Sequence, residues 1–380
     1  MNPGTNLVTW MREFALPLWA ARGLDPEHGG FVEELSPEGH PADPGFKRVR
    51  VQGRQLFSFA TAALLDWHPK AAALADAGYE FIKHRCRAAD GSWARRLKTD
   101  GTVLDPQLDL YDTAFIVLGL SAYYRLNRHP ETLRLIEAAL EMVKARLAVP
   151  GGKGYYQSLD DRGMLRQNPH MHWFETMLFC FDATKDQRYL EEAGRIYQLA
   201  KDHIIDPATG ALREIFDDKW KPALEGGKIL VEPGHHCEWA WLLWKAGQVL
   251  PMDPSLQKSI LGFADRYGVN TGTGLVYDQV SDKGELTQPT HRLWVQTEAL
   301  KAWLVRPDMA EPQRENRIKQ IEANLLKYYL TREPLGSWGD RLDIQGNLQK
   351  GPVPTSSMYH LMVCVTELAA WRSRKNSQPH

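Results

Sequence analysis

The sequence lacks the features that mark membrane-spanning, secreted or nucleic-acid-binding proteins. It contains no run of about 18 apolar residues, so we expect no transmembrane helix. Its first residues, MNPGTNLVTWMREF, show neither the basic leader nor the apolar segment of a signal peptide. Lys and Arg number 46 and Asp and Glu number 47, so no net field attracts nucleic acid or an anionic membrane.

Cysteine is also scarce, and no two cysteines have the CxxC spacing. Three of the four lie in apolar helical stretches, where a free thiol behaves as a small hydrophobe; the set is Cys86, Cys180, Cys237 and Cys364. The phosphate-binding patterns GxxxxGK(S/T) and GxGxxG after a strand are absent as well. We therefore expect a reduced, cytoplasmic protein that uses no nucleotide cofactor.

One pattern occurs six times along the chain. A glycine opens a short strand-like run and a turn, which predicts a small β-hairpin; these runs begin at Gly29, Gly91, Gly154, Gly210, Gly274 and Gly336. A helix that is apolar nearly all round follows each run, as in YDTAFIVLGLSAYY. More polar, amphipathic stretches such as ETLRLIEAALEMVKARL lie between these sets. A helix that is apolar on every side is expected inside a protein, and a helix with a single apolar face is expected at its surface.

The period of this pattern predicts the architecture. Successive inner-helix starts, marked by Arg54, Asp112, His172, His235, Trp294 and His360, are 58, 60, 63, 59 and 66 residues apart. Each unit holds an outer helix, a hairpin and an inner helix, and TNLVTWMREFALPLWAARG supplies the first outer helix. Length alone suggests two or three domains. The repeats instead predict an all-α (α/α)6 barrel, with six inner and six outer helices in a single domain over residues 1–380.

The predicted hairpins directly precede the inner helices, so they and the helix N-termini should lie at one end of the barrel. The positive ends of the helix dipoles would meet there and favour anionic groups. Polar residues at these starts should converge on one funnel, which we take as the candidate site.

Two inner helices share a His-x-x-Glu spacing. His172 precedes Glu175 in HMHWFE, and His235 precedes Glu238 in HHCEW. Residues three apart share a helix face, and a carboxylate beside an imidazole fixes its tautomer and stabilises its charge. His360 opens the sixth inner helix. Three imidazoles at equivalent helix starts favour a catalytic site over structural histidines.

Other polar and aromatic residues should complete the funnel. Arg54 offers a permanent charge with a fork of donors, suited to hydroxyls or a developing oxyanion. We expect substrate contacts from Glu175, Asp112, Tyr111, Trp294, Gln296, Glu298, His170 and Trp338, with Trp93 and Tyr155 as further rim aromatics.

Structural interpretations stand beside these expectations. Arg54 could form an ion pair only, Asp112 and Glu298 could balance helix dipoles, and His170 and His236 could support neighbours. The HMH and HH spacings could bind zinc or manganese. Each glutamate already has an imidazole, however, so we expect no metal.

Five segments together resemble the N-acylglucosamine 2-epimerase superfamily, whose members include D-mannose isomerase, sulfoquinovose isomerase and cellobiose 2-epimerase. They are VQGRQLFSFA, NPHMHWFE, EPGHHCEWAWLL, RLWVQTEAL and SSMYHL, in family order over nearly the whole chain. The EPGHH-x-EWAWLL pattern is similar to the D-mannose isomerase branch. The resemblance implies a metal-free and cofactor-free reaction on a reducing sugar, with catalytic residues at Arg54, His172, His235, Glu238 and His360.

These residues suit an enediolate mechanism. We expect His172, tuned by Glu175, to open the sugar ring and His360 to remove the C2 proton. His235, held by Glu238, would move protons between O1 and O2. Returning the proton to C1 converts mannose to fructose, or lyxose to xylulose, which we favour. Returning it to the opposite face of C2 gives a 2-epimerase for mannose/glucose, N-acylglucosamine or cellobiose.

Two other classes fit less well. A glycoside hydrolase needs two carboxylates across a scissile bond, and here Glu175 and Glu238 come with histidines. A sugar-binding module would not need three imidazoles. The expected partner is therefore a small monosaccharide, and the sequence leaves open whether the chain is a monomer or a homo-oligomer.

Overall fold

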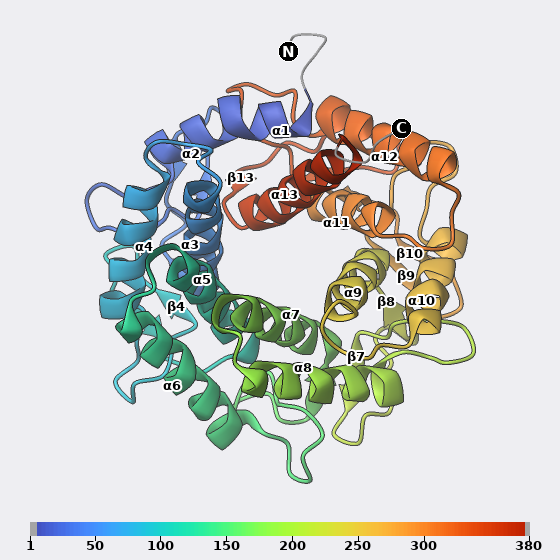
Figure 1. The fold of residues 1–380 in the computed structure, drawn as a ribbon, viewed down its shortest axis with the longest axis horizontal. Helices are drawn as coiled ribbons and strands as arrows, with labels where there is room; N and C mark the ends of the chain where they lie inside the picture. Colours follow the sequence, from blue (N-terminus) through green and yellow to red (C-terminus); the bar gives the residue numbers. More distant parts are fainter. Residues whose placement is uncertain (1–5, 377–380) are drawn as a thin grey trace.

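The computed structural model describes residues 6–376, which form two concentric rings of helices (Figure 1). Within these residues, six helices make the inner ring: α3 (Val49–Leu64), α5 (Leu110–Asn127), α7 (Gln167–Thr184), α9 (Pro233–Ala246), α11 (Leu293–Leu304) and α13 (Ser357–Asn376). The structure thus confirms the predicted (α/α)6 barrel.

The outer ring alternates with the inner one along the chain. Its first member is α1 (Leu7–Trp10), the π-helical η1 (Met11–Ala15) and α2 (Leu16–Arg22) in succession. The others are α4 (Ala71–Arg85), α6 (Pro130–Leu147), α8 (Gln187–Leu199) continued by the π-helical η2 (Ala200–Ile204), α10 (Pro254–Tyr267) and α12 (Glu311–Tyr328). In inner α5, 13 of 18 residues are buried, against 6 of 18 in outer α6. This contrast is the one that the hydrophobic patterns predict.

Short antiparallel strands lie at one end of the barrel. Three of the predicted hairpins form, as β1 (Glu34–Leu35) with β2 (Pro41–Ala42), β4 (Arg96–Leu97) with β5 (Val103–Asp105), and β9 (Gln279–Ser281) with β10 (Leu286–Gln288). The runs after Gly154, Gly210 and Gly336 do not pair as two regular strands. They supply β6 (Met164–Arg166), β7 (Ile215–Asp217) and β12 (Arg341–Leu342), with isolated bridges beside them.

Pairing between units occurs in hairpin and non-hairpin runs alike. The residues just before each inner helix pair with the strand region of the following unit. The pairs are β3 (Lys47–Arg48) with β4, Asp109 with Ser158, β6 with β7, β8 (Leu230–Val231) with β9, β11 (His291–Arg292) with β12, and β13 (Val353–Pro354) with β1. We call this chain of contacts the strand belt. Its last pair joins the first unit to the last one and closes the ring.

None of the helices in residues 6–376 combines the length and the apolar character needed to cross a membrane.

Inner helices α3 and α5 approach so closely that only glycine fits between them. A Cβ atom on Gly119 would lie 2.4 Å from the carbonyl oxygen of Gly53, and one on Gly53 would lie 2.3 Å from that of Phe115. Backbone atoms cannot move aside as a flexible side chain can, so both positions exclude any side chain.

We predict opposite effects for two Gly→Ala substitutions. Gly119→Ala should lower the free energy of unfolding by about 1–3 kcal/mol, because it overpacks the inner ring. Gly262→Ala is the matched control: it is exposed on outer α10, with no contact within 4 Å of a new Cβ. That change should raise stability by about 0.5–1 kcal/mol. Urea titration of both variants measures this, and equal midpoints would contradict the close approach of α3 and α5.

Candidate active site

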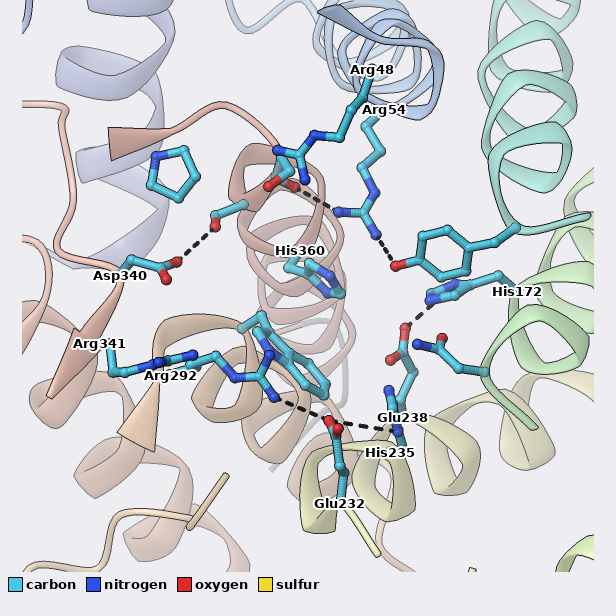
Figure 2. Close-up of a pocket in the computed structure, with 16 residues that line it drawn as sticks. Arg48, Arg54, His172, Glu232, His235, Glu238, Arg292, Asp340, Arg341 and His360 are labelled. Carbon is cyan, nitrogen blue, oxygen red and sulfur yellow. Dashed lines mark hydrogen bonds and ion pairs between the residues drawn. The ribbon is translucent and has the colours of Figure 1, made fainter. Parts of the chain in front are cut away.

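A cavity of about 360 Å³ opens at the N-terminal end of the inner helices (Figure 2). All five residues expected to be catalytic line it, together with Tyr111 and Trp294: Arg54, His172, His235, Glu238 and His360. These seven residues come from all six inner helices, and the strand belt brings them together from positions up to about 300 residues apart. Polar side chains therefore gather where the sequence places the funnel.

His172 and Glu175 form the pair that their spacing predicts. The Nδ1 of His172 lies 3.0 Å from Oε2 of Glu175, and the Tyr359 hydroxyl donates to Oε1 of the same carboxylate. Burial lowers the pKa of His172 to about 4 despite this partner. At neutral pH the imidazole is therefore uncharged, with its hydrogen on Nδ1 and a free lone pair on Nε2.

His235 has different partners from the one expected. Its Nδ1 lies 2.9 Å from Oε1 of Glu214 and 3.9 Å from Oε2 of Glu232. Burial lowers the pKa of His235, but the charges of Glu214 and Glu232 outweigh burial and raise it to about 9. His235 is thus an imidazolium at neutral pH. The expectation that Glu238 holds it is wrong, since Glu214 accepts its hydrogen bond.

Glu238 is the carboxyl group left without a fixed partner. Neither of its oxygens has a hydrogen-bond partner among residues 6–376, and Oε1 lies 4.0 Å from Nδ1 of His172. Burial, together with the nearby charge of Glu298, raises its pKa well above the ordinary value. The environment of Glu238 therefore favours the protonated form of this carboxyl group, which faces the cavity.

His360 is held from below by a buried ion pair. Its Nδ1 lies 2.8 Å from Oε1 of Glu298, whose Oε2 is 2.6 Å from Nζ of Lys301. Burial and the positive charge of Arg54 keep the pKa of His360 well below its usual range. The indole of Trp294 lies 5.1 Å from the His235 ring and 5.5 Å from the His360 ring, centroid to centroid. A charged and a neutral imidazole thus flank one aromatic side chain.

Arg54 reaches into the cavity beside His360 (Figure 2). It donates to the Tyr111 hydroxyl at 2.8 Å and to the Ser356 carbonyl at 3.2 Å, and its guanidinium lies 3.9 Å from the Phe115 ring centroid. Aromatic and neutral contacts leave its charge uncompensated there, which suits it to a developing oxyanion.

Several lining residues were not among those expected from the sequence. Arg48, Arg292 and Arg341 stand on short strands at the mouth, and Asn168 and Glu232 sit at helix starts. Arg48 pairs with Glu33, Arg292 donates to Glu232 at 3.1 Å, and Nε of Arg341 lies 3.6 Å from Asp278. Arg48 and Arg341 are isolated arginines and carry no recognisable spacing. Asn168, Glu232 and Arg292 could have been found, since they open the NPHMHWFE, EPGHH and RLWVQTEAL segments.

Two expected substrate contacts, His170 and Gln296, do not line the cavity. The Tyr155 amide donates to Nε2 of His170 at 2.9 Å, and Nδ1 of His170 donates to the Arg166 carbonyl at 2.7 Å. With both nitrogens engaged and its pKa lowered to about 4 by burial, His170 has a structural role. Gln52, His236 and Gln296 accept backbone N–H groups in the same way, from Phe31, Leu212 and Val276.

Asp112 and Trp338 also lie outside the cavity lining. Asp112 is buried in an ion pair with Arg50 at 2.9 Å. Trp338 is buried and stacks on Trp19 with a centroid separation of 4.7 Å. The Tyr155 hydroxyl bonds Glu192 at 2.6 Å beneath the surface, so of these rim aromatics Trp294 alone lines the cavity. Glu175 and Glu298 act on histidines rather than facing the cavity.

Two clusters of carboxylates and imidazoles, which share Glu238, have ligand atoms close enough together to bind a metal ion. Ligand atoms within 4.8 Å of one another occur in His172, Glu175 and Glu238, and in Glu238, Glu298 and His360. The donor set fits poorly, however. Both histidines already direct Nδ1 at a carboxylate, and the ammonium of Lys301 already neutralises Glu298.

The charge of His235 can be tested directly. We predict that Glu214→Gln lowers the pKa of His235 by about 1–3 pH units, because one of its two carboxylate partners loses its charge. NMR titration of the imidazole, assigned with His235→Gln, measures the change. Glu285→Gln is the control, since Glu285 is exposed and pairs with Lys228 away from the cavity. An unchanged pKa in Glu214→Gln would show that Glu214 does not set the charge.

Comparisons with known proteins show the family of this chain. The model of the N-acylglucosamine 2-epimerase (GlcNAc 2-epimerase) family matches residues 29–364. A mannose-6-phosphate isomerase of Rhizobium meliloti (strain 1021) is 32% identical over 372 residues, which cover 95% of each chain. A cellobiose 2-epimerase of Bacteroides fragilis is 23% identical, covering 88% of this chain and 90% of that protein.

A solved structure shows the same fold. The crystal structure of a D-mannose isomerase superimposes with a TM-score of 0.84 at 20% identity, covering 96% of this chain and 97% of that one. The related proteins are sugar isomerases and sugar 2-epimerases, so an enzyme acting on a sugar is the class supported here. The chain belongs to the N-acylglucosamine 2-epimerase family.

Proposed function

We propose that this protein is an aldose–ketose isomerase that interconverts D-mannose and D-fructose through a cis-enediolate. The observation that carries the proposal is that two imidazoles with opposite pKa shifts, His235 and His360, line one cavity. His360 is neutral and can accept a proton, whereas His235 is charged and can donate one. An enediolate reaction needs both groups, one at C2 and one at the oxygens.

Ring opening comes first in this mechanism. The free Nε2 of His172 accepts the proton of the O1 hydroxyl and returns one to the ring oxygen as the bond from C1 to that oxygen breaks. Glu175 holds the tautomer through Nδ1 at 3.0 Å. Neutral Glu238 lies beside this imidazole and offers a second proton donor.

Proton transfer follows in the open chain. Nε2 of His360 takes the C2 proton, the electron pair forms the C1–C2 double bond, and His235 protonates O1 while Arg54 stabilises the charge. His235 then accepts the O2 proton, and His360 delivers its proton to C1, which gives the ketose. Each positioned acid or base contributes about 10²–10⁴-fold to the rate.

A 2-epimerase is the alternative outcome of the same chemistry. His235 and His360 flank Trp294, so a protonated His235 could return a proton to the opposite face of C2. The relative named cellobiose 2-epimerase favours this possibility. We prefer isomerisation because the EPGHHCEWAWLL segment is similar to the D-mannose isomerase branch and the 32% identical relative is named an isomerase.

We predict that EDTA-treated protein converts D-mannose in D2O to fructose with deuterium at C1, as proton NMR will show. His360→Gln should lose at least about 10²-fold in rate, since no other group takes the C2 proton. His84→Gln, exposed on outer α4, should be unaffected. Glucose without fructose would indicate the epimerase. Retention of the C2 proton would rule out mannose as the substrate. Activity that appears only after a metal ion is added would contradict a metal-free reaction.

A phosphorylated sugar is a second candidate substrate. Arg48, Arg292 and Arg341 line the mouth of the cavity, where they would face the far end of a sugar whose C1 and C2 lie at the histidines. The relative named mannose-6-phosphate isomerase points the same way. Arginine is the residue best suited to bidentate contact with phosphate.

We predict that, if phosphate is recognised here, kcat/KM for mannose 6-phosphate exceeds that for mannose. Arg341→Ala should then lower the phosphate value by about 10–100-fold, the loss of one charged hydrogen bond, and leave mannose unchanged. Arg96→Ala is the control, since Arg96 is a half-exposed strand residue outside the cavity lining. An equal loss on both sugars would contradict a phosphate contact.

We also propose a reducing, cytoplasmic setting, because all four cysteines are buried free thiols.

A further inference from the structure

Lys301 is a buried cation beneath the cavity, and no part of the proposed chemistry uses it. It lies on inner helix α11, its side chain is 0% exposed, and its Nζ is 2.6 Å from Oε2 of Glu298. The ammonium also lies 3.9 Å from the centroid of the Trp241 ring. Burying an ammonium in an apolar helix ring is costly unless its partners compensate.

Groups from every helix packed around Lys301 share its field. Glu175 on α7, Glu238 on α9 and Glu298 on α11 raise the pKa of Lys301 above the value that burial alone would give, so it stays protonated. His360 and Tyr359 on α13 and His172 on α7 lie in the same cluster. One cation cannot neutralise three carboxylates, so the unpartnered Glu238 takes up a proton while the other two stay bonded to histidines.

We propose that Lys301 is a positioning residue for His360, which it orients by keeping Glu298 ionised. An ionised Glu298 accepts the Nδ1 hydrogen of His360 at 2.8 Å and leaves Nε2 without a hydrogen, facing the cavity. A protonated Glu298 would instead donate to Nδ1, move the hydrogen of the ring to Nε2 and remove the base. The effect on catalysis rests on the proposed function of His360, whereas the effect on the tautomer does not.

The location of the pair argues against a role in stability alone. Apolar residues of similar volume commonly replace a buried ion pair without loss of stability, so the pair alone is weak evidence for a role in folding. This pair instead shares its carboxylate with a histidine that lines the cavity. Even beside Lys301, burial raises the pKa of Glu298 to about 6. Without the ammonium, Glu298 would therefore carry a proton at neutral pH.

We predict that Lys301→Met lowers kcat by about 10²-fold or more and leaves KM nearly unchanged, because Lys301 does not touch the cavity. The acid limb of the pH profile, expected near 6 in the unmodified protein, should move to higher pH. Lys245→Met is the matched control: Lys245 lies 6.0 Å from the same Trp241 ring but pairs with Asp182 at 3.1 Å, outside the cavity lining. An unshifted acid limb in Lys301→Met would overturn the proposal.

A double substitution separates positioning from structural support. If Lys301 acts through Glu298, then adding Lys301→Met to Glu298→Gln should change kcat by less than about threefold. The double variant buries neither charge, so it should fold even where Lys301→Met alone does not. A further loss of tenfold or more in the double variant would show that Lys301 acts by another route.

The tautomer of His360 gives a readout that needs no substrate. Long-range proton–nitrogen NMR spectra, assigned with His360→Gln, should show hydrogen on Nδ1 in the unmodified protein and on Nε2 in Lys301→Met. If the unmodified protein converts none of the sugars, the proposed function fails while this comparison still tests Lys301. An identical tautomer in both proteins overturns the role of Lys301 even when the enzyme is active.

Discussion

The strand belt is the constraint on which the site depends. The residues immediately before each inner helix pair with the next unit, and β13 with β1 completes the circle by pairing Glu34 with Pro354. Because these pairs precede the helices, they fix where each first turn begins and bring all of them to one end. Arg54, near the start of the chain, thereby contacts the carbonyl of Ser356, near its end. A cavity shared by six inner helices requires this closure.

The first turns serve the belt as well as the cavity. Gln52, His170, His236 and Gln296 accept backbone N–H groups from the connection that precedes the local strands, at 2.6–2.9 Å. These buried amides would otherwise be unpaired, at about 1–3 kcal/mol each. Neighbouring positions on one helix therefore have separate purposes. His170 and His236 support the backbone, while His172 and His235 face the cavity.

The sequence predicts the fold and the five cavity-lining residues of the family motifs because both depend on periodicity and local spacing. The His172–Glu175 pair follows from helix geometry alone. The same argument fails for His235, whose partner Glu214 lies 21 residues away, before β7 and outside the helix. Similarly, Trp338 resembles a rim aromatic in sequence, yet stacking on Trp19 depends on an element more than 300 residues earlier. Contacts between units cannot be read from the spacing within one unit.

The three histidines illustrate how the number of charges, not the residue type, sets protonation. Each has Nδ1 at 2.8–3.0 Å from a glutamate oxygen, and Nδ1 of His235 also lies 2.8 Å from Nε2 of Gln167. His235 faces two carboxylates, and their combined charge exceeds the cost of burial. The carboxylate of His360 is already neutralised by Lys301, and Arg54 adds repulsion, so burial prevails and the ring stays neutral. At neutral pH the cavity therefore holds two imidazoles in different protonation states: His235 is a proton donor and His360 is a proton acceptor. The difference arises because two carboxylates face His235, whereas His360 is buried beside two cations, Arg54 and Lys301.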